Sequence, residues 1–336
     1  MIELSIIIVN YKSAGLIIEC LKTIYAETND LLFEIIVVDN DSKDGSKELI
    51  MHMFPEIIWI EMNYNSGFAR ANNEGIRHSK GEVLLLLNAD TLIIGNAIEK
   101  CVRLFTKSTF VACGVQLLNT DLSPQISGNY FIKGGLNYLL PLPYFGNFIK
   151  WLGVLFSVKK PNVANTNSTI VVDWINGAFL MVNKWATEKS GLLDEDFFLY
   201  AEETEWCSRL KKIGDLCIFG EIKVIHLQGE TAVSTFKSTD KTYNNLFDKK
   251  GLQIMISNMV RIRKQFGVGW FLLMVSLYVF EIPLFFLGII IAKLIQGSRS
   301  KFSFAQFRGY CKNMIFILGK ISKIVSNKPH FYKILS

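Results

Sequence analysis

The 336-residue chain is long enough for one large α/β domain with an appendage, and half of its residues are apolar, which excludes a disordered chain. Its net charge of +6 is unevenly spread: residues 261–336 carry twelve Lys and Arg against one acid, Glu281, and so contribute +11, leaving −5 for residues 1–260. A basic tail whose cations flank a long apolar run fits an anionic membrane surface, and no nucleic-acid-binding motif accompanies it.

The cysteines and the N-terminus indicate the compartment. Six cysteines form no CxxC pair, so the sequence predicts neither a zinc ribbon nor a thioredoxin-like site, and free thiols in a reducing compartment are the simplest account. An acid, Glu3, stands where a signal peptide would be basic, and the first apolar run stops at Val9. We therefore expect the chain to begin in the cytosol.

Short β-branched runs alternate with helical periodicity in the first part of the chain, which is typical of buried parallel strands in an α/β fold. The expected elements are strands at 4–9, 34–39, 57–60 and 82–87, a helix at about 14–26, and a loop leading into a helix at 66–79. Ligands of open α/β sheets bind beyond the carboxyl ends of the strands. The polar residues expected to converge on one crevice there are Asn10, Asp39, Asn63 and Asp90.

The pattern changes after residue 130. Residues 130–165 are apolar and aromatic, contain glycines and prolines, and lack a clean period, which predicts a mobile apolar loop. The elements expected beyond it are strands at 171–173 and 177–182, a Glu-rich stretch at 194–212, and a strand at 223–226.

The last part of the chain predicts membrane association. Residues 268–295 are almost continuously apolar, longer than the roughly 20 residues that span a bilayer. However, Glu281 and Pro283 lie at the centre of this run, and a charge at mid-bilayer costs about 2.5 kcal/mol or more. Two interpretations therefore stay open: one span, or an interfacial or re-entrant pair of half-helices broken at Pro283. The expected domains are 1–260 and a membrane-associating helical tail, 261–336.

Two motifs carry oxygen ligands at strand ends. Asn88 and Asp90 form an i, i+2 pair that points two side chains the same way in extended backbone, as ligands of Mg²⁺ or Mn²⁺ on a diphosphate would. A simple turn after the strand would also explain them. In the loop 39–46, helix capping explains Ser42 and Asp44 but not Asp39, which should face the crevice.

Three acids and one histidine are further candidates. Glu202, Glu203 and Glu205 lie within four residues of sequence, where either the dipole of a helix start or a general base for an acceptor hydroxyl explains them. His226 ends an apolar run and is either a packed core histidine or a third metal ligand.

Taken together, these stretches resemble the family 2 glycosyltransferases, whose GT-A fold is a nucleotide-binding α/β sheet that uses a metal-bound diphosphate sugar. The matching runs are SIIIVNYKS, EIIVVDNDSKDGS, NYNSGFARANNEGI, GEVLLLLNADT, WINGAFLMVNK and GLLDEDFFLYAEETEWCSRLKKIG, followed by VIHLQGET. They cover most of residues 4–235, and their order and spacing make the resemblance specific.

The resemblance implies a nucleotide site. Asn10, Tyr11 and Asp39 match nucleoside contacts, with Asp39 on a pyrimidine, and Arg70 matches a residue that reaches the base or the phosphates. Asn63, in the matching run NYNSG, is expected at the bound nucleotide, as is Asn88.

The resemblance also implies a metal and a base. Asn88 and Asp90 match the D-x-D metal motif with its first Asp replaced by Asn, as in a rhamnosyltransferase-like branch, and His226 matches a late metal-binding histidine. Glu203 matches the Asp of the family's E-D motif, the general base. Since its side chain is longer than Asp, Glu202 or Glu205 could instead be the base.

The implied activity is an inverting transfer that depends on Mg²⁺ or Mn²⁺. dTDP-L-rhamnose is the first expected donor and UDP-sugars the second. The expected acceptor is a glycan or a polyprenyl-linked glycan in bacterial surface polysaccharide (O-antigen or capsule) synthesis, at the cytoplasmic face of the inner (plasma) membrane.

Two other functions compete with this one. A nucleotidyltransferase should carry a Gly-rich, basic phosphate loop after the first strand, and residues 10–15 are a poor version of one. A catalytically silent membrane-associated partner of a glycan assembly complex is compatible with the replacements at Asn88 and Glu203, although Asp90, Glu203 and His226 stay chemically competent.

Overall fold

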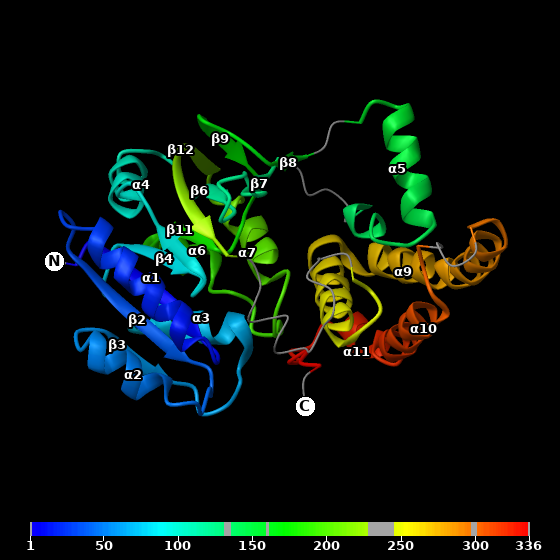
Figure 1. The fold of residues 1–336 in the computed structure, drawn as a ribbon, viewed down its shortest axis with the longest axis horizontal. Coiled ribbons are helices and arrows are strands. Elements are labelled where there is room, and N and C mark those ends of the chain that lie inside the picture. Colours follow the sequence, from blue (N-terminus) through cyan, green and yellow to red (C-terminus); the bar gives the residue numbers. More distant parts are fainter. Residues whose placement is uncertain (1, 131–135, 159–160, 228–244, 297–300, 335–336) are drawn as a thin grey trace. The chain divides into compact units, whose positions relative to one another are not determined.

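The computed structural model describes residues 2–130, 136–158, 161–227, 245–296 and 301–334 (Figure 1). The chain divides into two compact units. The first comprises Met1–Phe131, Pro161–Phe198 and Glu202–Thr231, and the second comprises Ile132–Lys160, Leu199–Ala201 and Ala232–Ser336. The second unit therefore includes a segment from the middle of the chain, whereas the sequence predicts a single boundary at residue 260.

The first unit is built on one mixed sheet, which confirms the predicted α/β class. Its strand order is β3-β2-β1-β4-β11-β6-β12-β5, and β9 pairs with β12. The parallel half comprises β1 (Leu4–Asn10), β2 (Phe33–Asp39), β3 (Ile58–Glu61) and β4 (Val83–Leu87). The other half comprises β5 (Thr91–Ile93), β6 (Ala112–Leu118), β9 (Thr169–Val172), β11 (Phe179–Asn183) and β12 (Leu216–His226). The strands expected before residue 90 are all present, because continuous apolar runs suit strands buried on both faces.

Helices pack on this sheet, and three short strands form a second, small sheet beside it (Figure 1). The helices are α1 (Ala14–Glu27), α2 (Ser46–Met53), α3 (Gly67–His78), α4 (Ala97–Thr106), α6 (Lys184–Ser190) and α7 (Glu202–Leu210). The small sheet joins β7 (Gly128–Asn129) to β8 (Asn162–Val163) and β10 (Trp174–Ile175). The core contains β-branched and leucine side chains of β1, β2 and β4 with the inner faces of α1 and α4.

Helix α3 corrects the expectation of a loop at its start. The helix begins at Gly67, whose φ of +77° favours glycine, and a Cβ there would lie 2.3 Å from the carbonyl oxygen of Phe198. Two buried amides inside the helix keep their hydrogen bonds: Asn72 donates to the Phe68 carbonyl and Asn73 to the Leu193 carbonyl. Because one of these partners lies 120 positions along the chain, local sequence does not reveal it.

The second unit is helical. Its elements are the 3-10 turn η1 (Leu136–Leu139), α5 (Phe145–Leu155), α9 (Lys249–Gln296), α10 (Phe304–Leu318) and α11 (Ile321–Ser326). Of the two interpretations of the apolar run, the structure has no break at Pro283: α9 continues through Pro283, and its non-helical residue is Gly267, with φ 88° and ψ 178°. By length and composition α9 could cross a membrane, and within the described residues no other helix meets that test.

Glu281 has a role that the sequence does not indicate. Its side chain is fully buried, with Oε1 accepting from the backbone N–H of Tyr144 (2.7 Å) and Oε2 from that of Phe145 (2.9 Å). These donors belong to the first turn of α5, where backbone N–H groups have no partner within the helix. Residues 145–155 are helical instead of the predicted loop, and a carboxylate 136 positions away caps the start of this helix.

Candidate functional site

The ends of β1 and β2 form one side of the site. Asn10 and Asp39 are paired in register, and Nδ2 of Asn10 donates to Oδ1 of Asp39 at 2.7 Å. The second carboxylate oxygen of Asp39 accepts from the backbone N–H of Ser42 at 3.1 Å. Asn10 has no exposed surface, and its Oδ1 accepts from the hydroxyl of Ser13. Asn10 therefore orients Asp39, which reaches the surface more directly.

A pocket of about 260 Å³ adjoins this carboxylate. Asp39, Trp59 and Asn63 line it, together with the loop from Asp41 to the start of α2. Asn63 is exposed and has a φ of +58°, a backbone conformation that Asn tolerates better than most residues. The predicted nucleoside residues Asp39 and Asn63 are thus brought together, and Tyr11 is half-buried just after β1.

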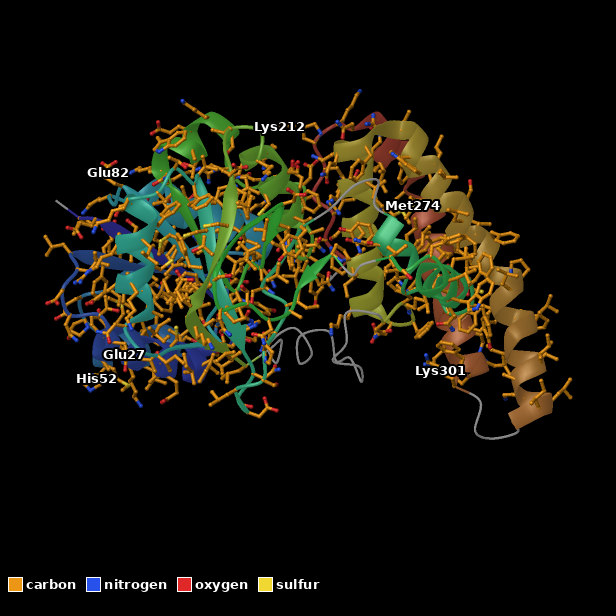
Figure 2. All side chains as sticks on the ribbon, turned by 90° about the horizontal axis from the view of Figure 1, so that it is seen from above. Glu27, His52, Glu82, Lys212, Met274 and Lys301 are labelled. Atoms are coloured by element: carbon orange, nitrogen blue, oxygen red, sulfur yellow. The ribbon has the colours of Figure 1, made fainter. Side chains whose placement is uncertain are left out.

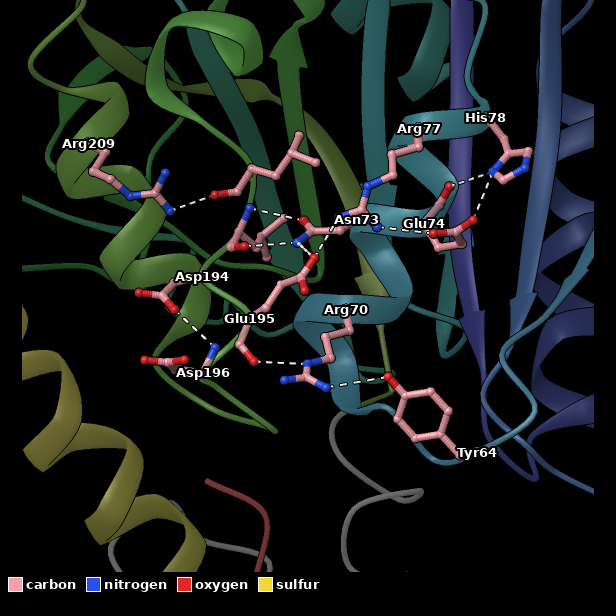
Figure 3. A network of polar contacts seen from close by, with 12 residues as sticks. Tyr64, Arg70, Asn73, Glu74, Arg77, His78, Asp194, Glu195, Asp196 and Arg209 are labelled. Atoms are coloured by element: carbon pink, nitrogen blue, oxygen red, sulfur yellow. Dashed lines mark hydrogen bonds and ion pairs between the residues drawn. The ribbon is translucent and has the colours of Figure 1, made fainter. Parts of the chain in front are cut away.

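Arg70 is hydrogen-bonded to the loop that contains Glu195, which is distant in sequence. Its Nε donates to the carbonyl oxygen of Glu195 at 3.0 Å, and one terminal nitrogen reaches the hydroxyl of Tyr64 at 3.4 Å (Figure 3). The same loop is held to α3 by Arg77, which pairs with the Glu195 carboxylate at 2.6 Å. Arg70 thus joins the residues around Asn63 to the loop that precedes α7.

The pairing of strands β5 and β12 brings Asp90 and His226 close together. Strands β5 and β12 are antiparallel with Thr91 opposite His226, and the backbone N–H of Leu227 donates to the Asp90 carbonyl at 2.9 Å. This register leaves Nε2 of His226 3.4 Å from Oδ1 of Asp90 and 3.5 Å from Nδ2 of Asn88. Asp90 and His226 are each 8% exposed. The three predicted metal ligands, Asn88, Asp90 and His226, therefore lie close together although they come from two distant segments of the chain.

Gln125 belongs to the same cluster, although the sequence does not single it out. Its Oε1 lies 3.0 Å from Nδ1 of His226. Gln125 stands in the loop after β6, and an isolated bridge between Leu118 and Pro124 folds that loop back. A buried glutamine in a polar loop leaves no periodic signal, so sequence patterning could not identify it.

The three acids at the start of α7 have different surroundings. Glu205 is 7% exposed and paired with Arg209 through both carboxylate oxygens, at 2.8 and 2.7 Å. Arg209 also donates to the carbonyls of Ser190 and Leu192, so Glu205 anchors a structural network. Glu202 is 3% exposed. Glu203 is half-buried, which makes it the most accessible of the three.

Glu203 lies close to the chain that supports Asn88. A Cβ added to Gly177 would stand 3.4 Å from Cγ of Glu203, and the next residue, Ala178, accepts the backbone N–H of Asn88 at 3.0 Å. Two non-glycine residues before α7, Tyr200 and Ala201, have φ of 73° and 68°. Strained backbone of this kind concentrates at functional sites.

Two cysteines near these residues are not nucleophiles. Burial raises the pKa of Cys20, next to Thr91, to about 12, and burial likewise raises the pKa of Cys207, in α7, to about 12. Both stay protonated at neutral pH and are therefore poor nucleophiles.

Comparisons with known proteins find similarity to glycosyltransferases. The sequence profile described as glycosyl transferase family 2 matches residues 5–157. The low-salt glycan biosynthesis hexosyltransferase Agl10 of Haloferax volcanii is 30% identical over 219 residues, 62% of each chain. The dTDP-rhamnosyl transferase RfbF of Shigella flexneri is 26% identical over 217 residues, 63% of this chain and 66% of its own length. The chain thus spans slightly less than two thirds of these relatives.

Among solved structures, GalNAc-T7 with UDP, GalNAc and Mn²⁺ has a TM-score of 0.50 at 14% identity, over 67% of this chain and 44% of that one. This likeness concerns the fold and confirms the GT-A type of sheet. The matching run VIHLQGET continues into residues 228–231, which lie outside the described residues. The N-terminal part of the chain, residues 5–157, thus matches glycosyl transferase family 2, and the relatives it resembles are named as glycosyltransferases.

Proposed function

We propose that the protein is an inverting glycosyltransferase that moves a sugar from a nucleoside diphosphate onto an acceptor hydroxyl. The observation that carries this proposal is the cluster of Asp90, His226 and Asn88 at the carboxyl edge of a sheet whose next strands end in Asn10 and Asp39. The match of residues 5–157 to glycosyl transferase family 2 and the relatives named for glycan synthesis and rhamnosyl transfer support it.

The donor atoms of this cluster fit a divalent cation that is shared with the substrate. Within the described residues no three His, Cys, Asp or Glu side chains gather, so protein atoms alone would not complete a coordination sphere. Mg²⁺ commonly uses one or two carboxylates, substrate phosphates and water. Asp90 and His226, with Asn88 beside them, would hold the ion while the diphosphate supplies further oxygens. When bound, the ion supplies charge neutralisation on the departing diphosphate.

The chain's own residues then have separate roles. Asp39, oriented by Asn10, accepts hydrogen bonds from the base of the nucleotide in the pocket that it lines. Glu203 takes the proton of the acceptor hydroxyl as that oxygen attacks the anomeric carbon. Glu205 is bound by Arg209, which makes it a poorer base than Glu203. Because one displacement occurs at the anomeric carbon, its configuration inverts.

dTDP-L-rhamnose is the donor we propose first. Asn88 in place of the first Asp of the metal motif resembles the rhamnosyltransferase-like branch, and one relative is named as a dTDP-rhamnosyl transferase. UDP-sugars come second. A glycan or polyprenyl-linked glycan at the cytoplasmic face of the inner membrane is the proposed acceptor.

The first test is donor turnover. Release of nucleoside diphosphate is measured for dTDP- and UDP-sugars with Mn²⁺, Mg²⁺ or EDTA, with membrane extracts as acceptor. We expect metal-dependent turnover of one donor, dTDP-L-rhamnose, with an inverted product by NMR. No turnover with any donor would contradict the enzyme proposal and favour the silent partner of a glycan assembly complex.

The second unit carries the proposed membrane surface. Its apolar side chains are exposed on α5 and just beyond it (Phe148, Trp151, Val154, Leu155, Phe156) and on α9 (Leu272, Leu273, Phe280, Leu287, Ile291, Leu294). Figure 2 shows these helices with their side chains, and Lys301 lies beyond the end of α9. Soluble proteins rarely expose apolar surface in such amount. Lysine and arginine side chains of this unit would add electrostatic attraction to a surface of anionic lipid.

This surface predicts a specific loss of lipid binding. The double variant Trp151→Ser/Phe156→Ser should bind phosphatidylglycerol vesicles at least about tenfold more weakly, because two half-exposed aromatic side chains contribute about 1 kcal/mol or more each at the interface. Co-sedimentation measures the binding. The control, Leu32→Ser/Leu122→Ser, replaces equally exposed apolar residues of the first unit and should bind as the parent does. Equal loss in both variants would contradict the assignment.

A further inference from the structure

The amide of Gln125 has only one orientation that satisfies its neighbours. Its Nε2 donates to the carbonyl oxygens of His226 (2.6 Å) and Leu118 (3.2 Å) and to Oδ1 of Asn119 (2.8 Å). Backbone carbonyl oxygens can only accept, so this end of the amide is the NH₂ group. The oxygen end, Oε1, therefore faces Nδ1 of the His226 ring at 3.0 Å.

This orientation decides which ring nitrogen of His226 carries the hydrogen. Oε1 of Gln125 offers only lone pairs, so a hydrogen bond between them requires the hydrogen on Nδ1. In the neutral ring, Nε2 then presents its lone pair toward Oδ1 of Asp90, 3.4 Å away. Neighbouring ligands of an octahedral ion with bonds of 2.0–2.1 Å are about 3 Å apart, so the two atoms are spaced for a shared cation.

We propose that Gln125 is a positioning residue that holds His226 in the Nδ1–H form, so that Nε2 binds a divalent cation together with Asp90. This inference rests on the metal site of the proposed function. Gln125 is itself rigid: it is 4% exposed, its N–H donates to the Leu117 carbonyl at 2.8 Å, and its carbonyl accepts from Gln116 at 3.0 Å. Partners that orient a ligating histidine are worth 10–100-fold in metal affinity as a rule.

The first experiment reads the ring directly. ¹⁵N NMR of the metal-free full chain, labelled on its four histidines, distinguishes protonated from bare ring nitrogens. The His226 signals are identified by their absence in His226→Ala, and the neutral form of the ring is the one that is read. We expect the hydrogen on Nδ1. Hydrogen on Nε2 would overturn the proposal, without any variant of Gln125 having to fold.

The second experiment measures the consequence for metal binding. Mn²⁺ is titrated into the protein, with and without UDP, and free Mn²⁺ is followed by EPR. Gln125→Met should weaken binding by about 10–100-fold, because the methionine side chain offers Nδ1 of His226 no oxygen acceptor. Gln253→Met is the control, since Gln253 is also a buried glutamine but lies in the second unit. It should lower the melting temperature and leave Mn²⁺ affinity unchanged.

The outcomes separate this inference from the proposed function. Unchanged Mn²⁺ affinity in Gln125→Met, while His226→Ala binds more weakly, would refute the role of Gln125. A parent protein that binds no Mn²⁺ in either condition would refute it too. Neither experiment uses a donor sugar or an acceptor, so a failure of sugar transfer would leave both results interpretable.

Discussion

Replacing Asp90 by Ala should abolish donor turnover, with kcat reduced by about 10³-fold or more. Asp90 is the only carboxylate placed by the structure beside Nε2 of His226 in the part of the chain described, at 3.4 Å. A bound cation contributes several kcal/mol to stabilising charge on a leaving diphosphate, and about 4 kcal/mol corresponds to 10³-fold. Initial rates with the preferred donor measure the effect, and the Mn²⁺ titration should show a parallel loss of affinity.

Two variants control this result. Asp121→Ala removes an exposed carboxylate that accepts from Ser123 in the loop before Gln125, and should leave kcat within about twofold. Asn88→Asp restores a second acid to the metal motif and should tighten Mn²⁺ binding, because an added negative charge next to Asp90 attracts the cation. Turnover by Asp90→Ala above a tenth of the parent rate would mean that this carboxylate does not hold the ion.

Replacing Glu203 by Gln should lower kcat by about 10²–10⁴-fold while the protein stays folded. The amide keeps the size of the side chain and its packing over Gly177 but cannot accept the proton of the acceptor hydroxyl. Because binding of the donor does not need this proton transfer, KM for the donor should change little. Rates with donor and acceptor at saturating Mn²⁺, together with thermal melting, measure both parts.

Glu205→Gln is the matched control on the same helix, and it should have the opposite profile. Glu205 is nearly buried and pairs with Arg209 through both oxygens, so its loss weakens a charge-assisted network and should cost about 1–3 kcal/mol of unfolding free energy. The activity of the folded enzyme should stay close to that of the parent. If Glu205→Gln lost turnover and Glu203→Gln kept it, the roles of the two acids would be reversed.

The predicted strands were confirmed because their signal is local. Runs such as residues 4–9 and 82–87 are continuously apolar and β-branched or leucine-rich, and the structure has β1 and β4 there. The helices of the central and C-terminal segments were harder to predict. The start of the helix 145–155 is capped by the distant Glu281 carboxylate, and the interruption of α9 falls at Gly267, where φ is positive, instead of at Pro283.

The sequence alone determined the resemblance to glycosyl transferase family 2, the α/β class and the strand ends that carry Asn10, Asp39, Asn88 and Asp90, because strand periodicity and the residues after each strand are properties of short segments. Only the tertiary structure decided which side chains of the candidate site contact one another. Antiparallel pairing of β5 with β12 brings His226 to Asp90, and the folded-back loop brings Gln125 to His226, 101 positions apart. Such contacts arise from sheet register and buried hydrogen bonds between distant segments, which no local pattern encodes.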